Sequence, residues 1–447
     1  MQTTDFFRLA ENGTTVRTEL LAGVTTFLSM AYILFVQPAV LCTDFAGHPT
    51  GLDAGAVLLA TCLASAAGSA LMGLLARYPI ALAPGMGENF FFVSVCMSLT
   101  ALGVSHAWQT ALALVFISGL VFLALSLVRL REAVIEAVSP SLCSGIAAGI
   151  GLFIAFIGLK NAGLIVARPG TLVGLNMHPV WADLAVFGVG LLVAAGLQAR
   201  KVRGALLLGI LAAAALALAL GKTRFTGLIG LPHIQQGAIW QMDFAQACSP
   251  AAWPFILVFL FMVLFDTVGT LVGVTQQAGL MQGNKLPRAT QAFFADAAAT
   301  TLGAALGTST VTSYIESATG VQAGGRTGLT ALTVGLLFLL ALLFSPLIAM
   351  VGSYAPITAP ALVLVGALMM QNVMRVAWDD VTEAVPAFLA LLGIPLTFSI
   401  ADGIAMSFVS YPVIKLLGGR GREVRWLMYA VAALLVYYFA FIRPRAG

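Results

Sequence analysis

Apolar stretches of about twenty residues follow one another along almost the whole chain, and they constrain the fold more than any other feature. A stretch of that length, coiled as a helix, crosses the hydrocarbon core of a bilayer. Only 9% of the residues are charged, whereas soluble domains carry about 25%. Because no soluble fold of 447 residues buries so much apolar surface, the sequence predicts an all-α polytopic membrane protein. The stretches are continuous rather than alternating in polarity, which excludes a membrane β-barrel.

The apolar stretches and two unusual segments together predict about fourteen membrane crossings. The apolar stretches are 20–42, 54–76, 107–129, 138–159, 181–199, 203–220, 253–276, 289–307, 327–351, 357–373, 384–400, 402–417 and 424–442. The unusual segments, 84–98 and 309–322, are shorter and richer in Gly, Ser, Thr and Asn. The stretch 424–442 is either an additional crossing or a helix in the membrane interface.

Basic residues between the apolar stretches predict the orientation of the chain, because cytoplasmic loops carry an excess of Lys and Arg. These residues alternate correctly with the crossings if the N-terminus is cytoplasmic, and the loops 161–180 and 221–252 then face outward. The basic groups concerned are Arg77, Arg129 with Arg131, Arg200 with Lys201 and Arg203, and Lys285 with Arg288. We therefore expect a multi-pass protein of the plasma membrane, with the bacterial inner membrane favoured.

The composition argues against several other classes of protein. The net charge of +4 is spread along the chain rather than gathered into a nucleic-acid-binding surface. Five dispersed cysteines form no CxxC pair, and no zinc spacing, Ser-His-Asp set or nucleotide fingerprint appears. We expect no enzymatic activity, no metal, no cofactor and no nucleic-acid partner.

Two polar, helix-breaking segments occupy matching places in the two halves of the chain. Residues 83–92 read APGMGENFFF and residues 307–316 read GTSTVTSYIE, and their glutamates lie 228 residues apart. Interrupted segments at corresponding positions of two halves indicate a transporter binding site near the middle of the membrane. If seven crossings separate the two segments, the halves have opposite orientations.

Two carboxylates in apolar surroundings are the strongest functional candidates. Asp266 lies in LFDTVGTLVG, and Glu316 lies in TSTVTSYIESATG. A charge at the bilayer centre costs about 2.5–3.5 kcal/mol on insertion scales, so sequences tolerate it mostly where a cavity, a partner or a proton needs it. We predict that both acids bind a ligand and exchange a coupling proton. The plainer interpretation, a structural acid paired to a neighbouring helix, stays open for each.

Residues beside the two acids are further candidates for ligand binding. They are Asn89, Glu88, Phe90, Tyr314 and Thr270. The amide offers a donor and an acceptor, and the rings offer flat faces for a planar ligand. Packing against lipid or core is the plainer interpretation of the phenylalanine. The hydroxyl run 308–313 is expected to satisfy backbone groups that a broken helix exposes.

Three other acids are expected to be structural. Asp296 and Asp402 lie within spans, and we predict that they bond hydroxyls or backbone ends on adjacent helices. Glu19 lies at the edge of the first span and is expected to be solvated or to stand at a helix start.

Four motifs together resemble those of a known family. They are GVTTFLSMAYILFVQPAVL, APGMGENFFF, FDTVGTLVGV and GTSTVTSYIESATGVQAGGRTGLTAL. The chain resembles, over nearly its whole length, the AzgA-like adenine/guanine/hypoxanthine permeases, a branch of the nucleobase transporters. The resemblance implies purine uptake coupled to protons, and it allows a homodimer.

The resemblance also implies a fold and a site. The fold is UraA-like, with fourteen helices in two inverted repeats of seven and with broken third and tenth segments. Residues 1–130 and 250–351 would form a core domain, and residues 131–249 and 352–447 a gate domain. The ligand would lie between the broken segments and the eighth helix, against Asp266, Glu316 and Asn89.

Departures from the family pattern keep other transport functions open. The family leads us to expect leucine at Glu88, and asparagine at Gln37 before Pro38. We expect a third acid beside the site to alter substrate preference, proton stoichiometry or pH dependence, so a uracil or xanthine carrier remains an alternative. An anion transporter of the same fold is a second, against which the acids and the lack of a nearby Lys or Arg argue. A passive channel is a third, which uphill accumulation would separate from a transporter.

Overall fold

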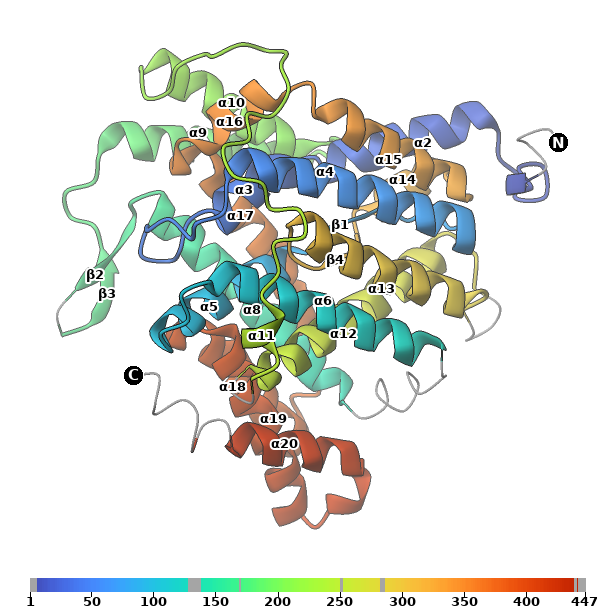
Figure 1. Cartoon of the computed structure of the whole chain (residues 1–447), viewed down its shortest axis with the longest axis vertical. Helices are drawn as coiled ribbons and strands as arrows, with labels where there is room; N and C mark the ends of the chain where they lie inside the picture. The colour runs from blue at the N-terminus through green and yellow to red at the C-terminus, as the bar shows by residue number, and fades with distance from the viewer. Residues whose placement is uncertain are drawn as a thin grey trace.

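The computed structural model describes residues 6–127, 138–168, 170–249, 252–281, 286–437 and 440. The chain is a bundle of long helices, most of which lie side by side (Figure 1). In the first half the elements are α2 (Val16–Met30), α3 (Ile33–Leu41), α4 (Ala54–Leu71), η1 (Met72–Ala76), β1 (Leu82–Pro84), α5 (Met86–Ala101), α6 (Ala107–Leu127), α8 (Pro140–Asn161), β2 (Ile165–Arg168), β3 (Leu172–Leu175), α9 (Trp181–Ala199), α10 (Ala205–Ala219) and α11 (Phe244–Ala247). In the second half they are α12 (Trp253–Gln277), α13 (Ala289–Leu306), β4 (Val311–Ser313), α14 (Ser317–Gln322), α15 (Gly328–Ala341), α16 (Ser345–Gly352), α17 (Ala355–Met369), η2 (Met370–Arg375), α18 (Val381–Thr397), α19 (Ile400–Leu417), η3 (Gly421–Glu423) and α20 (Trp426–Tyr437).

The polytopic all-α fold is confirmed, as are the broken third and tenth segments. Among the described residues, eight helices are long and apolar enough to cross a membrane. The third segment is the strand β1 followed by α5, and the tenth is the strand β4 followed by α14. Within the described part of the chain, α20 follows the fourteenth segment, α19; the predicted end of its stretch at 442 lies outside the described residues.

Two spans predicted as continuous are interrupted. The first ends one helix at Met30 and starts another at Ile33, and the predicted span 327–351 divides into α15 and α16. The first break has no glycine or proline in its gap, so no local signal predicts it, whereas the second is followed by Pro346 in the first turn of α16. The break in the first span places Tyr32 and Gln37 beside the tenth segment, as described below.

The same packing pattern occurs twice, which supports two inverted repeats. In the first half α4 packs against α15 and α13, and in the second half α13 packs against α6 and α4. The first helix of each half repeats the pattern: α2 packs on α15, and α12 packs on α6. β1 and β4 pair antiparallel, so the two broken segments run in opposite directions.

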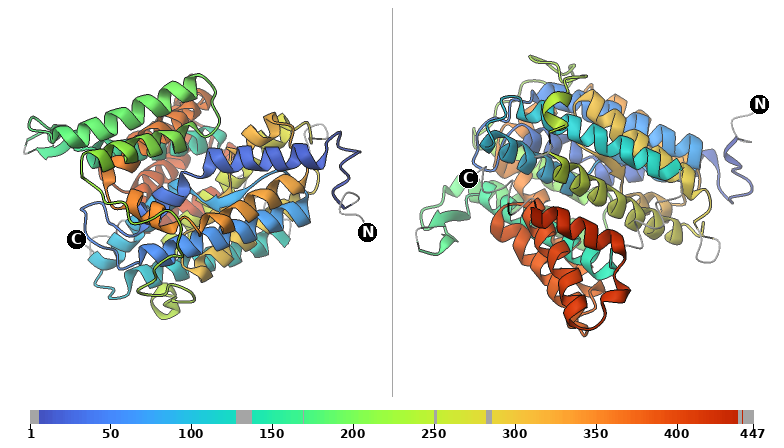
Figure 2. Two further views of the ribbon diagram at one scale, coloured as in Figure 1. Left: turned by 90° about the horizontal axis from the view of Figure 1, so that it is seen from above. Right: turned by 60° about the horizontal axis from the view of Figure 1, so that its bottom comes forward.

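The helices form two groups by their contacts. The first helix group comprises α2–α6 and α12–α16, and the second comprises α8–α10 and α17–α20. In the second helix group, α8 packs between α17 and α18. α9 and α10 pack together beside α17 and appear as the two green helices in the left view of Figure 2. α5 and α12 of the first group touch α19 of the second, so the groups share an interface. Two predicted core and gate boundaries, at 130 and 250, fall at segments outside the described residues.

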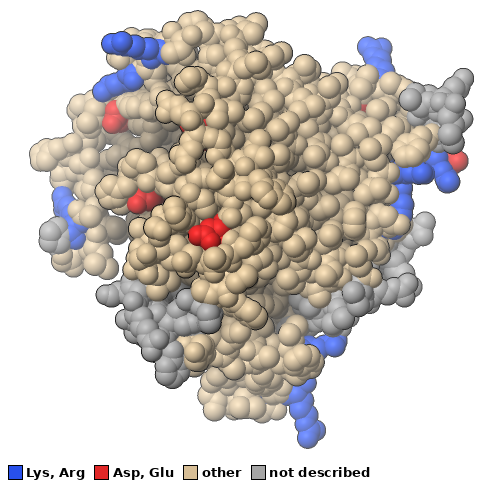
Figure 3. Space-filling model, viewed as in Figure 1, with Lys and Arg blue, Asp and Glu red and all other residues tan. Residues whose placement is uncertain are grey.

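The surface of the bundle matches a lipid environment. On the face drawn in Figure 3, Lys and Arg side chains gather at the periphery, and uncharged residues cover most of the area between them. Large apolar side chains are exposed along the outer helices, among them Leu192, Leu336 and Leu396. In water such a surface would aggregate, whereas hydrocarbon accommodates it.

Glu19 lies in the first turn of α2, so the second of the two predicted alternatives, an acid at a helix start, is confirmed. Its side chain is fully buried, so the expectation of a solvated acid is wrong. It accepts hydrogen bonds from the backbone N–H groups of Arg326 and Thr327, at 2.9 and 3.3 Å, and from the Thr330 hydroxyl at 2.6 Å. These donors belong to the start of α15, where free N–H groups favour an anion. Glu19 therefore ties α2 to α15 at one end of the bundle.

A buried ammonium group joins the ends of α18 and α19. The Lys415 side chain is 2% exposed and lies 2.9 Å from Glu383 and 3.1 Å from Glu423. Arg420 bridges Glu423 and Asp380, at 2.8 and 2.6 Å. Hydrogen bonds from Thr382 and Arg420 hold the pKa of Asp380 at about 2, so this carboxylate stays ionised at neutral pH. The cluster is a charged clamp within the second helix group.

Replacing this ammonium group is expected to loosen the second helix group. Lys415→Met leaves Glu383 without its nearest cation, and we expect a loss of about 1–2 kcal/mol, moderated because Glu423 is half exposed. Thermal unfolding in detergent measures the change. The matched control is Lys222→Met: the Lys222 side chain is 36% exposed, its ammonium group lies 3.9 Å from Asp183, and its loss is expected to cost less than about 1 kcal/mol. Equal effects of the two substitutions would contradict the clamp.

Candidate functional site

The two broken segments cross inside the bundle and satisfy each other's backbone. Leu82 pairs with Ser313 and Pro84 with Val311, and the Tyr314 N–H donates to the Ala81 carbonyl at 2.9 Å. The Ser69 hydroxyl lies 2.9 Å from the Leu82 N–H, for which it is the acceptor. Non-helical backbone is tolerated at membrane depth only when such partners exist. The short sheet therefore holds α5 and α14 at a fixed crossing point.

The hydroxyl groups of residues 308–313, in the tenth segment, donate hydrogen bonds mainly to side chains rather than to the backbone. Ser309 donates to Asn89, Thr312 to Asp266 and Ser313 to Asp296. The predicted role, satisfying exposed backbone groups, belongs instead to the pairing of β1 with β4. The hydroxyls thus link the crossing point to three polar side chains on neighbouring helices.

Among the described acids of the predicted spans and broken segments, Asp266 has the most open surroundings. Its side chain is exposed on α12 and accepts a hydrogen bond from the Thr312 hydroxyl at 3.2 Å. On the same helix face, Gly269 is exposed and has open space around the position of a Cβ atom. Gly273 follows one turn later, and its nearest neighbour is a side-chain carbon of Ile315 at 3.6 Å. An accessible face therefore leads from Asp266 toward the C-terminal end of α12.

Asp296 is connected to Asp266 through two threonines. The Asp296 side chain is fully buried and accepts hydrogen bonds from Thr267 and, at 2.8 Å, from Ser313. The Thr267 hydroxyl also lies 3.3 Å from the Thr312 hydroxyl. The prediction that this acid bonds hydroxyls on adjacent helices is confirmed. Asp402 is also buried, on α19 in the second helix group.

Glu316 lies at the start of α14 and is paired with a residue that the sequence did not single out. Its carboxylate accepts a hydrogen bond from the Tyr32 hydroxyl at 2.9 Å, and its side chain is partly exposed. Tyr32 is buried at the break between α2 and α3. A tyrosine in the middle of an apolar span was the available signal, because a buried hydroxyl there needs a partner.

Asn89 is held in a network with the first span. Its side-chain amide donates to Gln37, and its oxygen accepts from Ser309. Gln37 in turn donates to the Thr308 hydroxyl at 2.9 Å. Asn89 and Gln37 are both fully buried, so the network joins α3, α5 and the tenth segment without contact with solvent. Direct binding of a ligand by Asn89 stays a prediction.

Disrupting this network is expected to destabilise the crossing point. Gln37→Leu removes the acceptor of Asn89 and a donor to Thr308, and an unsatisfied buried group costs about 1–3 kcal/mol. We expect a lower unfolding temperature of the purified protein. Gln37→Asn, the residue expected at this position from the family, keeps an amide and serves as the control. A protein unaffected by Gln37→Leu would contradict the structural role of the network.

The remaining candidate residues occupy buried positions around the crossing point. Glu88 is 4% exposed in the first turn of α5, where its carboxylate folds back over Gly85. Tyr314 donates its hydroxyl to the Pro84 carbonyl at 2.5 Å. Thr270 is 6% exposed, one turn beyond Asp266 on α12. Phe90 packs among other phenylalanines rather than beside the acids. Ligand contacts of these residues stay predictions.

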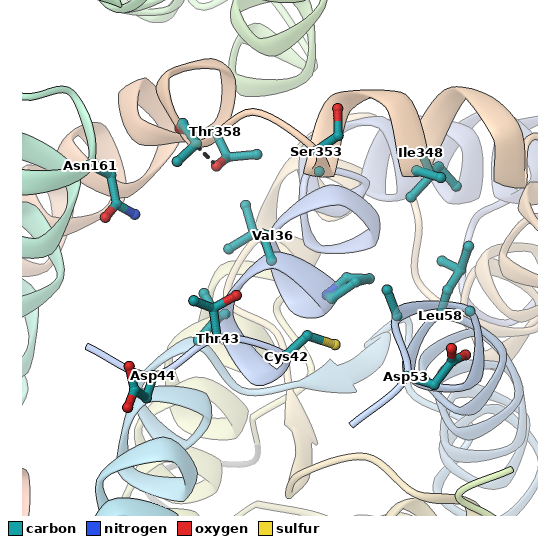
Figure 4. A pocket seen from close by; sticks show the side chains of 18 of the residues that line it. Val36, Cys42, Thr43, Asp44, Asp53, Leu58, Asn161, Ile348, Ser353 and Thr358 are labelled. Carbon is teal, nitrogen blue, oxygen red and sulfur yellow. Dashed lines mark hydrogen bonds between the residues drawn. The ribbon is translucent and has the colours of Figure 1, made fainter. Parts of the chain in front are cut away.

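A large cavity lies between the two helix groups, away from the acids. Its volume is about 890 Å³, and Cys42, Asp44, Asp53 and Asn161 are among its lining residues (Figure 4). Segments 42–55, 226–235 and 345–358 contribute to its wall, together with Lys160 at the end of α8. We call this cavity the vestibule. None of the described lining residues is Asp266 or Glu316, so the vestibule and the acids are separate in this structure.

The geometry of the broken segments and the acids defines a class of protein. Two antiparallel half-segments cross inside a membrane bundle, and two acids on adjacent elements have access to open space. Irregular backbone with intramembrane acids at the interface of two inverted repeats is typical of secondary transporters.

Comparisons with known proteins give the family. Residues 17–406 match the model described as the Permease family, and the chain belongs to this family. It is 47% identical over 446 residues to the guanine/hypoxanthine permease PbuG of Bacillus subtilis, covering 98% of this chain and 99% of the relative. It is 44% identical over 434 residues to the adenine permease AdeQ of Escherichia coli, covering 96% and 94%. The protein is therefore a membrane transporter and not an enzyme.

A solved structure gives independent evidence for the fold. The transmembrane domain of a cyanobacterial bicarbonate transporter, BicA, has a TM-score of 0.65 over 86% of this chain and 97% of that one. Its sequence identity is only 15%, so the similarity concerns the arrangement of helices. The same architecture thus serves substrates of different chemistry.

Proposed function

We propose that the protein imports purine nucleobases, such as adenine, guanine or hypoxanthine, together with protons. The observation that carries the proposal is the pair of accessible acids, Asp266 and Glu316, on either side of the crossing point. A purine edge combines N–H donors with ring-nitrogen acceptors, and carboxylates accept from such donors. Two relatives that are 47% and 44% identical to this chain are named as a guanine/hypoxanthine permease and an adenine permease, which agrees with this substrate class.

We expect the site to select bases through the energetic cost of leaving its polar groups without hydrogen-bond partners. In a site closed from water, a base that lacks the right donors leaves Asp266 or Glu316 without a partner, and that loss is expensive. Of the aromatic candidates, Tyr314 would cover a ring face, while Asn89 and Thr270 would read its edge; Phe90 packs among phenylalanines away from the acids. Glu88 lies close to this site, and we expect it to influence the pH dependence of uptake rather than the choice of base.

Proton coupling follows from the same two acids. A carboxylate is costly to move through a low-dielectric region, and protonation removes most of that cost. We propose that a proton on Asp266 or Glu316 accompanies the base, and that both leave on the other side. The hydrogen bond from Tyr32 to Glu316 holds this carboxylate in place while its protonation changes.

The two helix groups would act as the moving parts. We propose that the first helix group is the core domain and the second the gate domain, with the N-terminus on the cytoplasmic side of the inner membrane. The accessible face of α12 leads to the loop before Arg288, and this basic loop favours the cytoplasm. On this view the present conformation is open to the cytoplasm. The homodimer remains an expectation from the family.

Other transport functions are less well supported. A passive channel needs a continuous polar path, whereas the vestibule and the acids are separate among the described residues. An anion carrier needs positive charge, and the described hydrogen bonds of Asp266 and Glu316 come from hydroxyl groups. Uracil and xanthine remain the closest rivals, because they present a similar donor and acceptor edge.

The test is uptake of radiolabelled adenine into proteoliposomes with and without an inward proton gradient. Unlabelled guanine, hypoxanthine, uracil and sulfate serve as competitors. Gradient-driven accumulation that only purines inhibit would support the proposal. Accumulation inhibited by uracil or sulfate but not by purines would overturn the substrate assignment.

A further inference from the structure

Four phenylalanine rings lie where the vestibule ends. Phe45, Phe90 and Phe398 line the vestibule, whereas Phe153 is fully buried behind them. The Phe153 ring meets all three edge-on, with centroid distances of 5.4 Å to Phe45, 6.1 Å to Phe90 and 5.7 Å to Phe398. Phe45 and Phe90 also stack, 6.4 Å apart. We call these four residues the aromatic cluster.

The aromatic cluster joins the two helix groups. Phe45 follows α3, and Phe90 belongs to α5 next to Asn89, so both rings come from the first helix group. Phe153 belongs to α8, and Phe398 ends α18, so these rings come from the second. Any relative movement of the two groups must therefore change the contacts among the rings.

Access to the acids comes from the opposite end of the bundle. The accessible face of α12 runs from Asp266 past Gly269 toward Gln277. The loop beyond α12 meets the end of η1, where Tyr78 donates to the Pro287 carbonyl. The vestibule wall instead contains the segment 42–55, at the other end of α4. In this structure one end of the molecule reaches the acids, and the other stops at the aromatic cluster.

We propose that the aromatic cluster is the gate between the vestibule and the nucleobase site, and that it is closed here. The inference rests on the proposed function for its substrate, but the barrier itself does not depend on the substrate. Edge-on contacts between rings are individually weak, so a rocking movement breaks them easily. An apolar barrier of aromatic rings excludes ions and water while a flat, uncharged base can slide along ring faces.

Phe153 is the residue on which the barrier depends most. It contacts each of the other three rings and lies on the helix that packs between α17 and α18. Phe156 provides a matched control, because it is on the same helix and its ring meets Phe398, at 5.1 Å. Phe156 does not line the vestibule. Removing either ring deletes the same side chain from α8, but only Phe153 joins the rings from both helix groups.

The test uses thiol labelling from each side of the membrane. Gly269→Cys places a thiol in open space beside Asp266, in a protein that keeps Cys42 and lacks the other four cysteines. Cys42 lines the vestibule and reports that an impermeant maleimide reaches it from that side. We expect the Gly269→Cys thiol to react only from the opposite side. Adding Phe153→Ala should raise its reaction rate from the vestibule side by about tenfold or more, while Phe156→Ala should not.

The outcomes separate the gate from the transport assignment. An unchanged rate from the vestibule side with Phe153→Ala, in a protein that still unfolds cooperatively, overturns the gate. If Phe153→Ala does not fold, Phe398→Ala is used, because this ring is only partly buried and its loss leaves the core of α8 intact. Labelling needs no purine, so it tests the gate independently of the substrate. If Phe153→Ala opens the gate but the protein shows no purine uptake, the substrate assignment is refuted and the gate is not. Equal effects of Phe153→Ala and Phe156→Ala indicate general loosening of α8 and also overturn the gate.

Discussion

Glu316→Gln is expected to abolish proton-driven accumulation while leaving substrate binding largely intact. The amide keeps the size of the side chain and still accepts a hydrogen bond from Tyr32. The amide does not take up or release a proton at neutral pH, so the side chain is always neutral and transport is no longer coupled to protonation at this position. We expect adenine to exchange across the membrane but not to accumulate against its gradient. Binding affinity should change by less than about tenfold, the equivalent of one neutral hydrogen bond.

The control for this substitution is Tyr32→Phe. It deletes the donor to Glu316 but keeps the carboxyl group, so accumulation should persist at a reduced rate. The two variants are compared in the same proteoliposomes, with adenine counterflow as the measure of exchange and gradient-driven uptake as the measure of coupling. Full accumulation by Glu316→Gln would show that Glu316 does not carry the coupling proton. Asp266 would then be the first candidate for that role.

Asp266→Ala is expected to have the largest effect on affinity. Asp266 is the exposed acid beside the crossing point, and its loss removes a charged acceptor for the N–H groups of the base. A hydrogen bond to a charged group contributes about 1.5–3 kcal/mol, which corresponds to about 10–150-fold weaker binding. Isothermal titration of the purified protein with adenine, guanine and hypoxanthine measures the change.

The matched control is Asp243→Asn, an acid that caps the short helix α11 outside the bundle. Asparagine caps a helix nearly as well as aspartate, so neither affinity nor stability should change. A milder variant, Asp266→Asn, keeps an acceptor for Thr312 and should fall between wild type and alanine. Unchanged affinity in Asp266→Ala would exclude this residue from the site.

The sequence predicted the fold because its signals are local. Apolar runs long enough to span a membrane predicted the helices. Pro84, Gly85 and Gly87 predicted the break in the third segment. The break at Tyr32 lies within an apolar stretch that has no local helix-breaking residue. In the structure, α3 turns there toward the tenth segment. Such a break depends on tertiary contacts, which a pattern of hydrophobicity does not contain.

The site was predicted in its acids but not in their partners. Charges in apolar surroundings are conspicuous, so Asp266 and Glu316 stood out, whereas Tyr32 looks like an ordinary residue of an apolar span. The antiparallel pairing of β1 with β4 decides which hydroxyl faces which acid. The role of each hydroxyl depends on the register between two strands that are distant in the chain, Leu82–Pro84 and Val311–Ser313, whose central partners Ala83 and Thr312 are 229 residues apart.

The most direct test of the central claim is the proton flux that accompanies the substrate. Proteoliposomes carrying a pH-sensitive dye inside receive adenine outside, with no imposed gradient and with a potassium shunt for charge. The account predicts acidification of the interior that depends on adenine, is inhibited by hypoxanthine and disappears in Glu316→Gln. Uptake of adenine without any change of internal pH would contradict proton symport and leave a uniporter or a carrier coupled to another ion.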